Sequence, residues 1–206
     1  MPALPEGSEE GILKGIYQVS AGPPFKSGLK VQLFGSGSIL HEALRAQNVL
    51  ATSFGVSSDV WSATSYKELR REALEVDRWN MLHPTAAPRK SYIESVLEDA
   101  EGPIIAASDY MKILPDMIRP WTRQPLVSLG TDGFGRSDTR EALRRHFEVD
   151  AESIAIAALH ALSIQGDVSK DDVEKAIRAL GVNPEKADPV SCGPATSYSR
   201  TVDENE

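Results

Sequence analysis

The sequence predicts an α/β fold of three layers, in which helices cover both faces of a mostly parallel five-stranded sheet with one antiparallel strand. Short apolar runs alternate with longer segments of helical periodicity, and glycines, prolines or capping residues separate the two kinds of segment. Such alternation is typical of strand-helix-strand units with right-handed crossovers. The length of 206 residues, with 41% hydrophobic and 25% charged residues, suits one globular domain.

Turn residues and periodicity place the first elements of the predicted sheet. The segments Gly15–Ser20 and Lys30–Phe34 are predicted strands, separated by a Gly-Pro-Pro turn. Their short connection makes the first one the candidate antiparallel strand. The glycine-containing turn Gly35–Ser38 then leads into a helix that Gly55 is expected to end.

A second strand-helix unit follows directly. Asp59–Thr64 is the third predicted strand, and Ser65 with Glu68 has the capping-box spacing that opens a charged helix toward Trp79. After two prolines, another helix is predicted over residues 91–100.

The last two strands and three helices complete the prediction. Pro103–Ala107 and Leu126–Leu129 are apolar runs of the buried-strand type, and Asp138 with Glu141 has capping-box spacing. The helices, which we expect on one face of the sheet, are Thr139–Phe147, Ala151–Gln165 and Lys170–Leu180, the last with Ser169 as N-cap and Gly181 as its stop.

Composition and charge exclude several classes of protein. Lys and Arg number 22 against 30 Asp and Glu, so the formal net charge of −8 disfavours nucleic acid and anionic membranes as partners. A single cysteine, Cys192, allows neither an intramolecular disulfide nor a zinc site, which favours a reducing compartment. The apolar runs are too short to span a bilayer and the first residues are not signal-like. We therefore expect a cytoplasmic location.

The turn after the second strand is a candidate anion site. An α/β domain often binds phosphate there, because backbone N–H groups at the following helix N-terminus point into the crevice. The candidate residues are Ser36, Gly37 and Ser38. However, Leu40 stands where a dinucleotide fingerprint needs its next glycine, and the P-loop lysine is absent. The alternative is a simple tight turn with Ser38 as the helix cap.

Other residue patterns point away from catalysis. The four histidines, at positions 41, 83, 146 and 160, include no pair at i, i+4, so no metal site is predicted. No serine lies in Gly-x-Ser-x-Gly, so no catalytic nucleophile is predicted. A loop after a helix contains Trp79, Asn80 and His83 close together. They either face a partner or line a channel, or they belong to a loop that Trp79 and Met81 anchor in the core.

The glycine-rich turn Thr131–Asp138 is more specific than a strand-turn-helix unit requires. Gly133 and Gly135 allow positive φ there. Asp132, Phe134, Arg136 and Asp138 are interface candidates, since interfaces favour phenylalanine and arginine. The alternative for the aspartates is an ordinary role in turns and caps.

Five motifs, taken in order and spacing, carry a family resemblance. They are Glu10–Tyr17, Leu33–Ile39, Arg78–Pro84, Ser108–Lys112 and Leu129–Asp138. From about Leu4 to Gly181 the chain resembles the C-terminal domain of the homodimeric pyruvate dehydrogenase E1 component, a transketolase-like, thiamine diphosphate-dependent family.

The resemblance implies a fold and a function. That family decarboxylates pyruvate with thiamine diphosphate and magnesium and passes the acetyl unit to a lipoyl group on the E2 component. The cofactor lies between the first two domains of opposite subunits, and the third domain extends the dimer interface. The family's thiamine motif starts Gly-Asp-Gly and ends Asn-Asn, whereas here Val168 follows Gly166 and Asp167 and no Asn-Asn pair exists. We therefore expect no cofactor, metal or catalytic residue in this chain alone.

The same resemblance sets the expected partners and boundaries. The upstream E1 domains and a second E1 subunit are the expected partners, with the E2 acetyltransferase complex as a further one. Residues 1–11 would be the lead-in from upstream domains, 12–182 the domain, and 183–206 a flexible acidic tail. The alternative is a free-standing regulatory module that binds a small anion or contacts E2.

Overall fold

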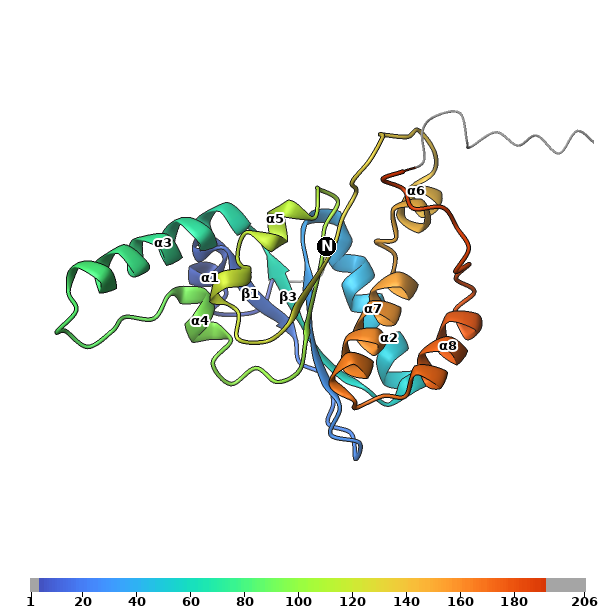
Figure 1. The fold of residues 1–206 in the computed structure, drawn as a ribbon, viewed down its shortest axis with the longest axis horizontal. Coiled ribbons are helices and arrows are strands. Elements are labelled where there is room, and N and C mark those ends of the chain that lie inside the picture. Colours follow the sequence, from blue (N-terminus) through green and yellow to red (C-terminus); the bar gives the residue numbers. More distant parts are fainter. Residues whose placement is uncertain (1–3, 192–206) are drawn as a thin grey trace, which may run out of the picture.

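The computed structural model describes residues 4–191, which form a five-stranded sheet with helices on both faces (Figure 1). The strand order is β1-β3-β2-β4-β5, and only β1 is antiparallel to its neighbour. The strands are β1 (Ile16–Ser20), β2 (Lys30–Gly35), β3 (Ser57–Ala63), β4 (Ile104–Ala107) and β5 (Leu126–Leu129). The predicted fold class is confirmed. The antiparallel strand β1 pairs with β3 and not with β2, because both edges of β2 already have parallel partners.

The helices agree with the sequence except where they are short. They are α1 (Glu9–Lys14), η1 (Gly37–Ile39), α2 (Leu40–Phe54), α3 (Tyr66–Leu82), α4 (Tyr92–Val96), α5 (Ile113–Asp116), η2 (Arg119–Trp121), α6 (Arg140–Phe147), α7 (Ala151–Gln165) and α8 (Lys170–Ala179). The sequence did not predict α1, α5 and η2, and α4 ends earlier than expected. Segments of fewer than two turns contain too little of the 3.6-residue repeat to be recognised.

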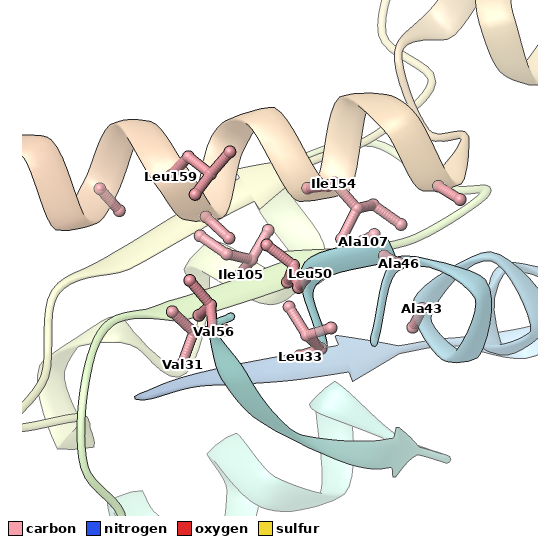
Figure 2. Packing of buried hydrophobic residues seen from close by; sticks show 14 of the residues in the cluster. Val31, Leu33, Ala43, Ala46, Leu50, Val56, Ile105, Ala107, Ile154 and Leu159 are labelled. Atoms are coloured by element: carbon pink, nitrogen blue, oxygen red, sulfur yellow. The ribbon is translucent and has the colours of Figure 1, made fainter. Parts of the chain in front are cut away.

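One face of the sheet is covered by α2, α6, α7 and α8. Leu33 and Ile105 from the strands pack with Leu50 of α2 and with Ile154 and Leu159 of α7 (Figure 2). All five side chains are buried. The prediction that the last three helices share one face is thus confirmed, and α2 joins them.

The opposite face carries α3, α4 and the segment around α5 and η2. Phe34 and Trp61 of the sheet meet edge to face at a ring-centroid distance of 6.3 Å, and Leu69, Ile93 and Trp121 complete this second core. The two cores together make the three-layer arrangement, with the sheet in the middle (Figure 1).

Caps at three helix starts refine the predicted boundaries. Ser65 accepts a hydrogen bond from the Glu68 N–H at 3.1 Å, and Ser169 caps α8, both as expected. The cap predicted at Asp138 is wrong. Thr139 caps α6, and the Asp138 carboxylate instead accepts from the Thr139 N–H at 2.7 Å. Two adjacent capping residues compete here, and Thr139 has the extended backbone that a cap requires.

The first residues after α8 contact the domain. Lys186 Nζ donates to the carbonyls of Arg145 and His146, at 3.0 and 2.6 Å, and forms an ion pair with Glu148 at 3.1 Å. Residues 192–206 of the predicted tail, including Cys192, lie outside the described residues. The domain boundaries stay predictions. Within residues 4–191, no helix has the length and apolar character needed to cross a membrane.

Tyr66 has a buried hydroxyl group. Its side chain is 5% exposed, and its O–H has no hydrogen-bond partner within residues 4–191. Burial raises the pKa of the phenol. We expect Tyr66→Phe to raise the free energy of unfolding by about 1 kcal/mol, since it removes an unsatisfied buried polar group. Urea unfolding measures this change.

Tyr92→Phe is the matched control for that substitution. The Tyr92 hydroxyl donates to the Ile16 carbonyl at 3.1 Å, so its removal should lower the free energy of unfolding by about 1 kcal/mol. A loss of stability in Tyr66→Phe equal to that in Tyr92→Phe would contradict the assignment.

Candidate functional site

A crevice lies at the carboxyl ends of β2 and β4. The chain leaves β2 toward β3 on one side, whereas β4 continues to β5 on the other side. Parallel sheets leave a crevice at such a reversal of strand order, and ligands commonly bind there. The crevice contains a cavity of about 300 Å³. Its polar lining consists of Ser38, Asp109, Thr131, Arg136, Arg140 and Arg144.

The turn after β2 forms the first wall, and Asp109 lies over it. Gly37 has φ +56°, and a Cβ atom built there would lie 3.3 Å from Asp109 Oδ1. The Ser38 hydroxyl donates to Asp109 Oδ2 at 3.3 Å. Ser36 is buried, and its N–H donates to the Ala107 carbonyl at 3.1 Å. The predicted anion residues therefore face a carboxylate of the protein itself.

The alternative role of Ser38 as the cap of α2 is wrong. A 3-10 turn, Gly37–Ile39, precedes the helix and places Ile39 at the cap position. The Ser38 side chain is therefore directed to Asp109 and not to a backbone N–H of α2.

The loops after β4 and β5 form the floor of the crevice. Thr131 donates from its hydroxyl to the Asp109 carbonyl and from its N–H to the Tyr110 carbonyl, both at 2.9 Å. Asp132 accepts from the Lys112 N–H at 3.3 Å. A Cβ atom at Gly130 would lie 2.5 Å from the Tyr110 carbonyl oxygen, so a glycine allows the two loops to approach. These contacts hold Asp109 and Thr131 side by side.

Arginines of the glycine-rich turn and α6 form the second wall. Arg144 Nη2 lies 3.4 Å from both the carbonyl and the hydroxyl oxygen of Ser38. Arg140, the first residue of α6, is exposed and has no ion-pair partner in the part of the chain that the structure describes. Arg136 lines the same cavity. The sequence singled out Arg136 but missed the other two, because nothing in its local pattern shows that α6 folds back toward β2.

Glu42 holds that wall in place. Its side chain is only 4% exposed, and its carboxylate accepts from Arg144 and Arg45, each at 2.7 Å, and from the Ala151 N–H at 3.1 Å. One buried carboxylate therefore joins α2 to α6 and to the start of α7. The sequence offered a weak signal for it, a charged residue next to the apolar positions of the predicted helix.

The pKa of His146 reflects its burial and the charges around it. Partial burial lowers its pKa, and the nearby positive charges of Arg136 and Lys186 lower it further, while Glu148 opposes them. Burial and, after it, the cationic surroundings therefore disfavour the protonated imidazole.

The four candidates in the glycine-rich turn have different surroundings. Asp132 and Asp138 accept local hydrogen bonds, and Arg136 lines the cavity. Phe134 is 64% exposed. Gly133 has φ +100°, while Gly135 is not among the residues with positive φ.

Phe134 is one of several exposed apolar side chains on the segments that follow β4 and β5. Tyr110, Met111 and Ile113 are between 57% and 61% exposed. Loop contacts through Thr131 bring the two segments together. We call Tyr110, Met111, Ile113 and Phe134 the sheet-edge patch.

The candidates at the end of α3 lie elsewhere. Figure 1 shows α3 projecting away from the sheet, on the side opposite α7. Trp79 stacks on His83 at 4.4 Å and carries the Arg89 guanidinium 3.7 Å from its ring centre. Asn80 exchanges two hydrogen bonds with the Arg89 backbone, at 2.8 and 3.0 Å. Met81 is 71% exposed, so it does not anchor this loop in the core.

Comparisons with known proteins show which family this chain is similar to. The profile of the transketolase-like TK C-terminal domain family matches residues 15–150. The chain is 47% identical to the pyruvate dehydrogenase E1 component of Pseudomonas aeruginosa over 192 residues, covering 93% of this chain and 22% of that enzyme. It is 48% identical to the Escherichia coli K12 enzyme over 92% of this chain, and 41% identical to the Mycolicibacterium smegmatis enzyme over 97%. In both, it covers 21% of the relative.

A solved structure supports the fold. A transketolase from Pichia stipitis, solved with sedoheptulose-7-phosphate, matches with a TM-score of 0.50 at 19% identity, over 82% of this chain and 21% of that chain. The chain therefore spans about a fifth of the length of the curated relatives that it matches.

Proposed function

The chain belongs to the transketolase-like TK C-terminal domain family, and on that basis we propose that it is the C-terminal domain of a pyruvate dehydrogenase E1 component. One observation carries the proposal. Identity of 47% extends over 93% of this chain, yet the match occupies only 22% of the relative. A piece that similar to one part of a larger enzyme is best understood as that part.

In this proposal the chain supports catalysis without performing it. Thiamine diphosphate and magnesium bind to the upstream domains of E1, which decarboxylate pyruvate and transfer the acetyl unit to lipoyl-E2. This domain packs against those domains and against a second E1 subunit. The E2 complex remains a predicted partner of the assembled enzyme.

The sheet-edge patch is the surface that we assign to assembly. Four large apolar side chains on the segments after β4 and β5 are each more than half exposed, and Phe134 was an interface candidate from the sequence. Exposed apolar residues that gather in one place commonly mark a protein-protein contact. The C-terminal end of α3, with Trp79, Asn80 and His83, is a second assembly surface, because aromatic and arginine side chains are favoured at interfaces.

A chimeric enzyme tests the proposal. The segment of the Pseudomonas aeruginosa enzyme that matches this chain is replaced by this chain. We expect the chimera to be dimeric by light scattering and to decarboxylate pyruvate with thiamine diphosphate and magnesium, while the isolated chain shows no turnover. Cofactor-dependent turnover by the isolated chain, or a folded chimera that is inactive, would overturn the proposal.

Phe134→Asp in the chimera tests the assembly surface. Loss of a large apolar contact at an interface costs about 2 kcal/mol, so the dissociation constant of the dimer should rise about thirtyfold. Ile164→Asp is the control, since Ile164 is an exposed apolar residue at the end of α7. Equal dimer dissociation constants for the two variants would remove the patch from the interface.

A further inference from the structure

We infer that the crevice between β2 and β4 binds a small ligand through an oxyanion group, a phosphate or a carboxylate. The crevice has room for such a ligand. A cavity of about 300 Å³ lies at the reversal of strand order, and its walls come from four separate segments of the chain. That volume is at the lower end of the range for small-molecule sites, roughly 300–1,000 Å³.

The charges that line the cavity favour an anionic ligand. Among residues 4–191, Arg136, Arg140 and Arg144 line the cavity together with one carboxylate, that of Asp109. The chain as a whole has a net charge of −8, so this concentration of positive charge runs against the composition. The lowered pKa of His146, caused first by burial and then by Arg136 and Lys186, is consistent with the same local excess. An anion is the ligand that such a wall stabilises.

Arg140 is the residue that we assign to ligand binding. Arg144 already holds Glu42 at 2.7 Å, so much of its charge is neutralised within the protein. Arg140 is exposed and forms no ion pair within residues 4–191. Its planar guanidinium can therefore donate two parallel hydrogen bonds to a phosphate or carboxylate.

The remaining groups fit a polar ligand of small size. The hydroxyls of Ser38 and Thr131 line the cavity, but each already donates its hydrogen to Asp109, so the arginines remain the donors for the ligand. Gly135 also lines it, and a Cβ atom there would meet no atom within 4 Å. Asp109 opposes the entry of an anion, which makes its charge a direct probe of the sign of the ligand.

The site is independent of the proposed function. It rests on the cavity and its charges, and it would persist in a free-standing protein as well as in an E1 domain. Failure of the chimeric enzyme would leave it untouched, and failure of the ligand test would leave the family and the assembly surface unchanged.

The experiment is a titration of the whole chain, labelled with ¹⁵N, with inorganic phosphate and separately with malonate, at constant ionic strength. We expect saturable shifts of the backbone amides of Ser38, Thr131 and Gly135 with at least one of the two probes. The probe that binds more tightly distinguishes phosphate from carboxylate as the recognised group. Absence of saturable shifts at these amides with both probes would overturn the inference.

Three variants establish the site and the sign of the charge. Arg140→Gln should weaken binding about tenfold, and Asp109→Asn should tighten it about tenfold, because each changes one unit charge beside the ligand. Arg70→Gln is the control, since Arg70 is also exposed and lies on α3, which packs on the other face of the sheet. It should leave the affinity within about twofold, as screening weakens distant charges.

Arg140→Gln and Asp109→Asn should change the affinity in opposite directions, and each direction can be contradicted. Equal effects of Arg140→Gln and Arg70→Gln would mean an adventitious ion only and would overturn the inference. Tighter binding by Arg140→Gln, or weaker binding by Asp109→Asn, would also overturn it. Thermal unfolding of each variant confirms that the fold is retained before its affinity is compared.

Discussion

Gly102→Ala is expected to lower the free energy of unfolding by about 4 kcal/mol, the sum of a left-handed backbone penalty and a steric clash. Gly102 has φ +78°, and a Cβ atom there would lie 1.7 Å from the Lys30 carbonyl oxygen. That oxygen belongs to the first residue of β2, so the clash cannot be relieved by rotating a side chain. The backbone of the sheet would have to move.

The movement would disturb pairing between β2 and β4. The Gln32 N–H donates to the Pro103 carbonyl at 2.9 Å, and the Gln32 side chain donates to the Glu101 carbonyl at 2.9 Å. Both acceptors are next to Gly102. We therefore expect the loss to appear in urea unfolding as a lower midpoint.

Gly55→Ala is the control for this glycine. Gly55 has φ +62°, close to that of Gly102, but a Cβ atom there would meet nothing within 4 Å. It therefore isolates the backbone penalty, about 1 kcal/mol. If the two substitutions cost the same, the close approach to Lys30 contributes nothing and the steric argument fails.

Glu42→Gln is expected to lower the free energy of unfolding by about 3 kcal/mol, because a buried ion pair loses one partner. The carboxylate receives hydrogen bonds from Arg144, Arg45 and the Ala151 N–H. A glutamine of nearly the same size has one acceptor oxygen and no charge. Arg144, whose side chain is 21% exposed, would lose its charged partner without gaining full contact with water.

A nearby glutamate provides the control. Glu152 pairs with Arg45 at 3.3 Å and with Arg145 at 3.4 Å, with its side chain 20% exposed. Glu152→Gln should cost less than about 1 kcal/mol, as is usual for ion pairs near the surface. Urea unfolding of both variants measures the difference. A loss in Glu42→Gln no larger than that in Glu152→Gln would contradict the role of Glu42 as the link among α2, α6 and α7.

Local pattern was sufficient for the strands and the longer helices. The five strands are apolar runs bounded by turn residues, and α2, α3, α7 and α8 are long enough to show their periodicity. The caps at Ser65 and Ser169 involve residues three positions apart, so the sequence contains all of that geometry. The short helices were not predicted, because a single helical turn shows too little periodicity to be recognised.

The candidate site could be predicted only in part. Ser36, Gly37 and Ser38 were singled out from local turn chemistry and Arg136 as an interface candidate, and the cavity has Ser38 and Arg136 in its lining. The decisive neighbours were not singled out. Asp109 contacts Ser38 across 71 positions of sequence, and Arg144 contacts Glu42 across 102. No local pattern encodes contacts at such separations.

By itself, the sequence determined the α/β class, the order of the main elements and, through five motifs, the family of this domain. These depend on short-range periodicity, turn chemistry and residue identity, which a chain expresses before it folds. Only the tertiary structure decided that β1 lies beside β3, that Asp109 covers the turn after β2, and that three arginines converge on one crevice. Those features arise when distant segments pack to bury both faces of the sheet, so their positions follow from the whole fold and not from any one segment.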